Sequence, residues 1–386
     1  MNWGRFHYII IATVLIWVSS NLNWGKSWEA VINHDIKGYY AYLPAVFIYQ
    51  DLQFGFYQDI KDKYGKEWDN ADYRLSLPNG TVVNKYYVGT AILEMPFFLL
   101  AHGLSGLTGF AQDGYSYLYV VFLCLSSIVY LFIGIFYFEK ILEIHGLSGY
   151  RKWLVIYALI FGTNAFVYTS VHPGMSHVYS FACINAFIYY FIQFRKTSSK
   201  GHFLLLAFLI GWITLIRPVN VIVIVGLLYF LNGSNDIIET FGQLRKMGSH
   251  FFLGLLLAIG IGSIQLIIYK LQTGAWIVYS YGEEGFNFSQ PEFINFLFSY
   301  RKGYFLYTPL ALLGLLGLLT IYRKNPFKFW SLSFFLLVLI YILSSWWCWW
   351  YGGSFSSRVM LEFSIFLFLP LGLLLQDIRA VVYQRL

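Results

Sequence analysis

Asp35 is the residue of this chain whose position best suits it for acid–base chemistry. It lies in the segment 33–44, directly after the first apolar stretch and at the start of a polar loop. A carboxylate just outside a membrane span can take the proton of a hydroxyl at the boundary between water and lipid. His34, Tyr39 and Tyr40 lie beside it and are candidates for substrate contact. His34 could also tune or replace the base, although a lone histidine is more often a hydrogen-bonded structural residue.

Four basic residues next to apolar stretches are candidates for binding an anion. They are Lys85, Arg217, Arg301 and Arg358. Lysine and arginine both bind phosphate, and the planar guanidinium can do so through two hydrogen bonds. Each of them, taken singly, could instead be a side chain that reaches from the membrane edge to water. Because the topology given below places all four on one side with Asp35, we expect them to hold the phosphate of a lipid-linked donor.

The segment 346–358 combines tryptophans, two adjacent glycines and a terminal arginine. Aromatic faces can stack on a pyranose ring, and glycine lets the backbone approach a ligand closely. Trp349 and Tyr351 are therefore candidates for sugar binding, with an ordinary interfacial belt as the alternative. Arg358 and Glu362 are four residues apart, so we expect them to share one helix face and to pair.

Three further residues are weaker candidates for substrate contact. Glu94 lies in an apolar setting and could contact the donor or the acceptor. His172 and His177 flank a Pro-Gly turn and could bind phosphate or a metal, but their spacing is not a recognised ligand pattern. We therefore expect no metal site. The sequence has no glycine-rich nucleotide-binding motif, and we expect no cofactor.

The composition defines the class of protein that must position these residues. Of the 386 residues, 58% are hydrophobic and only 12% are charged, and the mean hydropathy is +0.59. These values indicate an integral membrane protein. The formal charge of +7 comes from short basic clusters between apolar runs, so it favours membrane topology over nucleic-acid binding.

Apolar windows of about 17 to 25 residues predict ten membrane spans. The windows are 7–24, 115–138, 153–170, 177–194, 203–216, 218–231, 251–270, 304–322, 330–345 and 359–375. With these spans, the basic clusters between helices fall on the cytoplasmic side together with both termini. The stretch 86–107 carries Glu94 and Pro96, so we expect an amphipathic or re-entrant element, with a kinked span as the alternative.

The chain is predicted to form a single membrane domain, residues 1–386. No linker or internal repeat divides it. The predicted outer loops are about 25–114, which includes the re-entrant element, then 171–177, 271–303 and 346–358. All the unusual polar residues fall in these loops or at their edges, so we expect the site on the outer face.

These features resemble the GT-C superfamily of membrane glycosyltransferases, in particular bacterial relatives of the protein O-mannosyltransferase and aminoarabinose-transferase families. The resemblance covers about residues 1–220: a long first outer loop with an early Asp, a lysine before a re-entrant apolar helix, and a short second outer loop. It implies an all-α polytopic fold, a GT-C-like bundle of about ten transmembrane helices with juxtamembrane helices in the first loop. It also implies that Asp35 is the catalytic base and that Lys85 meets the donor phosphate. The second outer loop lacks the acidic pair of metal-dependent members, which favours a metal-independent reaction.

The resulting hypothesis is an inverting glycosyltransferase. It would move a sugar from a polyprenyl-phosphate donor to a hydroxyl of a cell-envelope glycan or lipid, on the outer face of a bacterial inner membrane. We expect a monomer whose partners are the donor, the acceptor and the bilayer, and no nucleic acid. The alternatives are a lipid-linked oligosaccharide ligase or polymerase, and a non-enzymatic carrier or flippase of a lipid-linked sugar.

Overall fold

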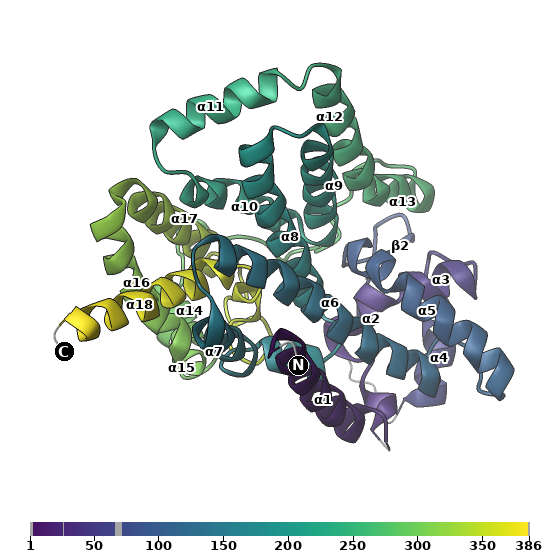
Figure 1. Ribbon diagram of the computed structural model, residues 1–386. Helices are drawn as coiled ribbons and strands as arrows, with labels where there is room; N and C mark the ends of the chain where they lie inside the picture. Colours follow the sequence, from purple (N-terminus) through teal and green to yellow (C-terminus); the bar gives the residue numbers. More distant parts are fainter. Residues whose placement is uncertain (1–2, 26, 66–71, 385–386) are drawn as a thin grey trace.

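The computed structural model of the chain describes residues 3–25, 27–65 and 72–384 (Figure 1). Residues 26 and 66–71 of the predicted first outer loop lie outside this range. The α-helices are α1 (Trp3–Asn23), α2 (His34–Tyr40), α3 (Tyr42–Phe47), α4 (Tyr57–Tyr64), α5 (Gly89–Thr108), α6 (Tyr117–Ile144), α7 (Gly149–Phe161), α8 (Ser176–Thr197), α9 (Lys200–Ile216), α10 (Val223–Gly226), α11 (Ser234–Arg245), α12 (Ser249–Gly262), α13 (Ile264–Thr273), α14 (Phe293–Phe298), α15 (Tyr304–Tyr307), α16 (Pro309–Lys324), α17 (Pro326–Ser344) and α18 (Ile365–Gln384). Shorter elements are the 3-10 segments η1 (Trp28–Ala30), η3 (Pro218–Ile222), η4 (Leu227–Phe230) and η5 (Arg358–Met360), the π-helical turn η2 (Val167–Val171), and the strands β1 (Arg74–Ser76) and β2 (Val82–Asn84).

Several helices are long and apolar enough to cross a membrane, as an integral membrane protein requires. In the described part of the chain these are α1 from Gly4, α5, α6 and α17, and the number rises to six if two bent helix pairs each count as one span. One bent pair is α12 with α13, at 41°, and the other runs from Pro218 to Arg245 with a 119° bend. An all-α membrane protein is therefore supported, while the count of ten spans stays a prediction.

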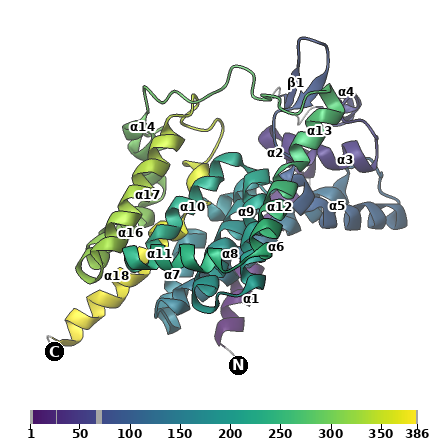
Figure 2. The ribbon, with the colours of Figure 1, turned by 90° about the horizontal axis from the view of Figure 1, so that it is seen from above.

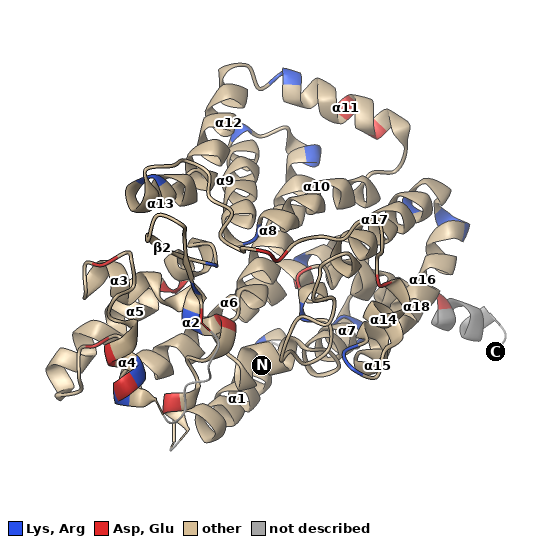
Figure 3. Cartoon of the chain, turned by 180° about the vertical axis from the view of Figure 1, so that it is seen from behind, with Lys and Arg blue, Asp and Glu red and all other residues tan. Residues whose placement is uncertain are grey.

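The two ends of the bundle carry different elements (Figure 2). The start of α1 and the end of α18 lie at one end, and the β hairpin, α4 and α14 lie at the other. Figure 3 shows charged residues on α4, α11 and the loops, whereas α6, α8 and α9 are mostly uncharged along their lengths. Inside the bundle α8 packs against both α6 and α9, and α16 packs against α18.

The predicted first outer loop is folded rather than extended. It contains α2, α3, α4 and a small antiparallel hairpin in which Arg74 pairs with Asn84. The hairpin was not expected, and its turn is made by Pro78, Asn79 and Gly80, the last at φ +82°, a conformation that glycine adopts without strain. The stretch 86–107 forms most of α5, which runs crosswise to α12 and α17 in Figure 2. Its length fits a span, and its direction fits an element that lies along a membrane surface.

Several predicted spans are shorter or more broken than expected; in 304–322, for example, α15 and α16 are separated at Thr308. In 153–170, α7 ends at Phe161 before Gly162, and a π-helical turn follows. In 218–231, η3, α10 and η4 replace a single α-helix, because Pro218 and a run of β-branched residues disfavour regular helix. In 359–375, regular helix begins only at Ile365, after η5.

Candidate active site

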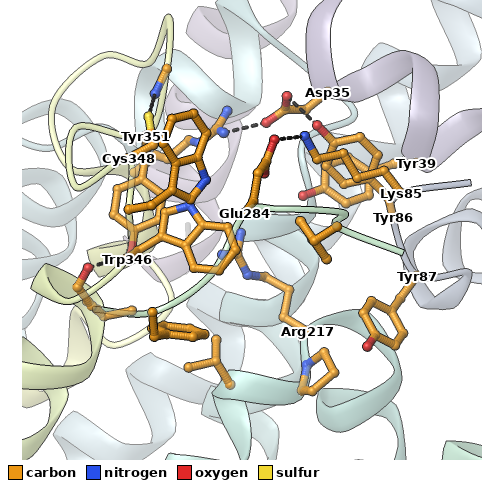
Figure 4. Close-up of a pocket in the computed structure, with 18 of the residues that line it drawn as sticks. Asp35, Tyr39, Lys85, Tyr86, Tyr87, Arg217, Glu284, Trp346, Cys348 and Tyr351 are labelled. Carbon is orange, nitrogen blue, oxygen red and sulfur yellow. Dashed lines mark hydrogen bonds and ion pairs between the residues drawn. The ribbon is translucent and has the colours of Figure 1, made fainter. Parts of the chain in front are cut away.

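A cavity of about 400 Å³ lies where the first loop, the end of α9 and the segment 343–358 meet (Figure 4). Its charged lining residues are Asp35, Lys85, Arg217, Glu284 and Arg358. Most of the remaining wall is aromatic or aliphatic. Three cations and two carboxylates therefore face one space that is otherwise apolar, which is the composition of a site for a small ligand with an anionic group.

Asp35 lies on α2 and is held by two partners. The Tyr86 hydroxyl donates a hydrogen bond to its Oδ1 at 2.6 Å, and the Arg358 guanidinium forms an ion pair with its Oδ2. Burial alone would raise the pKa of Asp35, but Arg358 and Tyr86 outweigh it and hold that pKa below its usual value. Asp35 is therefore ionised at neutral pH, and 24% of its side chain remains exposed.

Glycine at position 38 lets Tyr86 reach Asp35. A Cβ at Gly38 would stand 2.1 Å from a ring carbon of Tyr86. Tyr39, the next residue on α2, also packs against the Tyr86 ring at 4.6 Å between centroids. Burial raises the pKa of Tyr86, and the neighbouring Asp35 raises it further, so its hydroxyl stays protonated and donates.

Lys85 follows β2 directly and forms an ion pair with Glu284. About a quarter of each side chain is exposed, 25% for Lys85 and 27% for Glu284. Glu284 comes from residues 279–287, which we call the strap and which contribute Tyr279, Tyr281, Glu284 and Phe286 to the pocket lining. The Lys85 ammonium also lies 5.8 Å from the ring centroid of Tyr281, another strap residue.

Arg217 enters the pocket from the end of α9. The residue before a proline avoids helical backbone angles, and Arg217 is accordingly extended, at φ −151° and ψ 109°. Its Nε lies 3.6 Å from the Glu362 carboxylate, and Glu362 also forms a 2.7 Å hydrogen bond with His177 Nδ1. Both Glu362 and His177 are fully buried and lie behind Arg217, outside the pocket lining.

The expected pairing of Arg358 with Glu362 is wrong. Arg358 pairs with Asp35, and Glu362 contacts His177 and Arg217. The prediction assumed one continuous helix through both residues. Because η5 covers only Arg358–Met360 and α18 begins at Ile365, the four-residue spacing does not place the two side chains on one helical face.

Besides His177 and Glu362, six predicted site residues do not line the cavity. Arg301 is exposed and stacks on Trp350 at 3.7 Å from its ring centroid, and Trp349 packs against the same ring. Tyr40 is buried and donates to the Gly114 carbonyl at 2.5 Å. Glu94 is buried in α5. The remaining two, His34 and His172, are exposed.

The pocket contains residues that the sequence analysis missed. Glu284, Tyr86, Tyr281, Trp346 and Trp347 all line it. Tyr86 adjoins Lys85, and Trp346 and Trp347 belong to the aromatic segment already singled out, so proximity in sequence could have found these three. Nothing in the sequence points to Glu284 or Tyr281, because their loop is far from Lys85 along the chain and approaches it only in the folded structure. Tyr39 and Tyr351, by contrast, were predicted and do line the cavity.

Within the described ranges, no three His, Cys, Asp or Glu side chains come together as a metal site. The expectation of a metal-independent reaction stays a prediction. No protein-family model matches the chain, and a search of curated proteins finds no significant match. What the chain does is therefore inferred from the pocket itself.

Proposed function

We propose that the chain is an inverting glycosyltransferase that uses a polyprenyl-phosphate sugar as donor. The acceptor is a hydroxyl of a cell-envelope glycan or lipid. One observation carries the proposal: Asp35, an ionised carboxylate, shares a cavity of about 400 Å³ with Lys85, Arg217 and Arg358. A ligand with an anionic centre and an apolar or saccharide part fits such a combination of cations and aromatic walls.

The reaction follows from these groups. The acceptor oxygen forms a bond to the anomeric carbon as the bond from that carbon to the phosphate oxygen breaks, which inverts the configuration. Asp35 takes the proton of the acceptor hydroxyl. The electron pair leaves with the lipid phosphate, whose growing charge Lys85, Arg217 and Arg358 stabilise. Because Arg358 pairs with Asp35, donor phosphate that draws Arg358 to itself also frees the base.

We propose that the pocket faces the outside of a bacterial inner membrane, with both termini in the cytoplasm and about ten crossings. In support, the start of α1 and the end of α18 share one end of the bundle, opposite the hairpin.

The direct test uses the full chain in lipid nanodiscs with a panel of radiolabelled polyprenyl-phosphate sugars and envelope acceptors. We expect Asp35→Asn to lower the turnover number by about 10²- to 10⁴-fold, as for loss of a general base. Asp59→Asn is the matched control, since Asp59 is an exposed carboxylate of the same loop. Unchanged turnover in Asp35→Asn would refute the base. Donor binding without transfer to any acceptor would indicate a carrier, and transfer of only long oligosaccharides would indicate a ligase.

A further inference from the structure

Glu284 neutralises a cation at the position where the donor phosphate is proposed to bind. Its carboxylate pairs with Lys85 inside the pocket lining. Figure 4 shows the two side chains meeting beside Asp35. A phosphate that reaches Lys85 must therefore displace this carboxylate or bind against its charge.

The backbone of the strap is fixed independently of that ion pair. On one side, Ser280 Oγ donates to the Lys85 carbonyl at 3.0 Å. On the other side, Trp347 N donates to the Gly285 carbonyl at 2.9 Å, and Asn287 N donates to the Ser345 carbonyl at 2.6 Å. The Glu284 side chain can consequently turn away from Lys85 while the strap remains in place.

Asp35 is held differently. It has both Tyr86 and Arg358 as partners, whereas within the described ranges the Glu284 carboxylate is held by Lys85. Glu284 is therefore the carboxylate that an incoming anion can displace at lower cost.

We propose that Glu284 determines the preference of the pocket for a phosphodiester over a phosphomonoester. This inference rests on the proposed function, in which the donor is a phosphodiester with one negative charge. The product, a polyprenyl phosphate, is a monoester with a charge of about −1.5 to −2 at neutral pH. The repulsion from Glu284 grows with ligand charge, so it weakens product binding more than donor binding. Glu284 thus favours release of the spent lipid phosphate, after which its carboxylate pairs with Lys85 again.

Measurements of equilibrium binding test the proposed role of Glu284 without any turnover. The probes are undecaprenyl monophosphate and its methyl diester, added to the full chain in nanodiscs. Binding is followed by the change in total tryptophan fluorescence, to which Trp346 and Trp347 in the pocket lining contribute. We expect Glu284→Gln to tighten binding of the diester about tenfold and of the monoester about a hundredfold. Glu283→Gln is the matched control, since Glu283 is the exposed neighbour on the same strap and does not line the pocket; it should change both affinities by less than about twofold.

A second variant pair shows whether Glu284 acts through the charge of Lys85. With Lys85→Gln in the background, adding Glu284→Gln should give a smaller gain in monoester affinity than it gives with Lys85 present. The inference would be overturned if Glu284→Gln increased the affinity for both lipids by the same factor, or for neither. If both lipids bind as expected but no sugar is transferred, the glycosyltransferase proposal fails while the role of Glu284 stands. If neither lipid binds any variant, both fail.

Discussion

Arg358 contacts Asp35 across 323 residues of chain, and this ion pair sets the protonation of the proposed base. A salt-bridged carboxylate is a weak base, so Asp35 has to lose Arg358 as its partner before it can take a proton. Arg358 has two possible partners in the proposed reaction, Asp35 before the donor arrives and phosphate afterwards. The protonation of the proposed base therefore depends on the Asp35–Arg358 pair more than on either residue alone.

The pH dependence of stability tests that pair. The pKa of Asp35 lies below its ordinary value of 3.8, so its stabilising contribution is fully present above that value and is lost as pH falls through the lower folded-state pKa. We expect Asp35→Asn to cost about 1–3 kcal/mol near neutral pH, because it leaves Arg358 without its anionic partner. Thermal unfolding in detergent should show a gap in Tm between wild type and variant that narrows below about pH 4.

Asp59→Asn serves as the control in the same series. Its Tm should track that of the wild type, since Asp59 is exposed on α4. A gap between wild type and Asp35→Asn that is equally large at low pH would mean that Asp35 stabilises the fold through something other than its charge.

At the scale of elements, a close approach of α5 to the end of α9 brings Lys85 and Arg217 to one pocket. A Cβ at Gly89 would stand 2.5 Å from backbone atoms of Leu215 and Ile216. Gly89 begins α5, four residues after Lys85, and Ile216 directly precedes Arg217. This contact is between backbones, so it cannot yield by rotating a side chain.

Gly89→Ala should therefore push α5 from α9. We expect a loss of about 1–3 kcal/mol in stability from overpacking, together with weaker binding of lipid phosphate as Lys85 moves from Arg217. Gly103→Ala is the matched control in the same helix, because nothing lies within 4 Å of its Cβ position. It should be neutral or stabilise by up to about 1 kcal/mol, as alanine favours helix over glycine. Equal effects of the two substitutions on phosphate binding would contradict the positioning role of Gly89.

At the scale of the whole molecule, the pocket and the two chain termini lie toward opposite ends of the bundle. The hairpin lies at the end opposite the start of α1 and the end of α18 (Figure 2). Asn232 lies near the turn between α16 and α17, since its carbonyl accepts a 3.0 Å hydrogen bond from Asn325. Asn79 in the hairpin turn and Asn232 are both exposed, and both begin Asn-x-Ser/Thr sequons.

Glycosylation during insertion into microsomes can report which end faces the lumen. If the hairpin end is outside, Asn79 should be modified and Asn232 should not. Thr81→Ala should then remove one glycan by gel shift, and Ser234→Ala should change nothing. The reverse pattern, with the glycan lost only in Ser234→Ala, would invert the proposed topology.

The sequence predicted residue types and segments better than contacts. Hydropathy identified the helical membrane class because apolar content and helix length follow from local composition. It also singled out Asp35, Lys85, Arg217 and Arg358, since ionisable residues at the edge of apolar stretches are visible one at a time. It missed the breaks at Gly162 and after Pro218, where local backbone preference interrupts otherwise apolar runs.

Only the tertiary structure shows which charged residues of the pocket form ion pairs with each other. Arg358 was expected to pair with Glu362, its near neighbour, but it pairs with Asp35. Lys85 meets Glu284, from a loop that carried no distinguishing pattern. Sequence determined which charges lie near a membrane edge, because the cost of burying a charge acts on each residue separately. Which cation neutralises which carboxylate was decided by the fold, because Coulomb attraction acts between whichever groups packing brings within a few ångströms, whatever their separation along the chain.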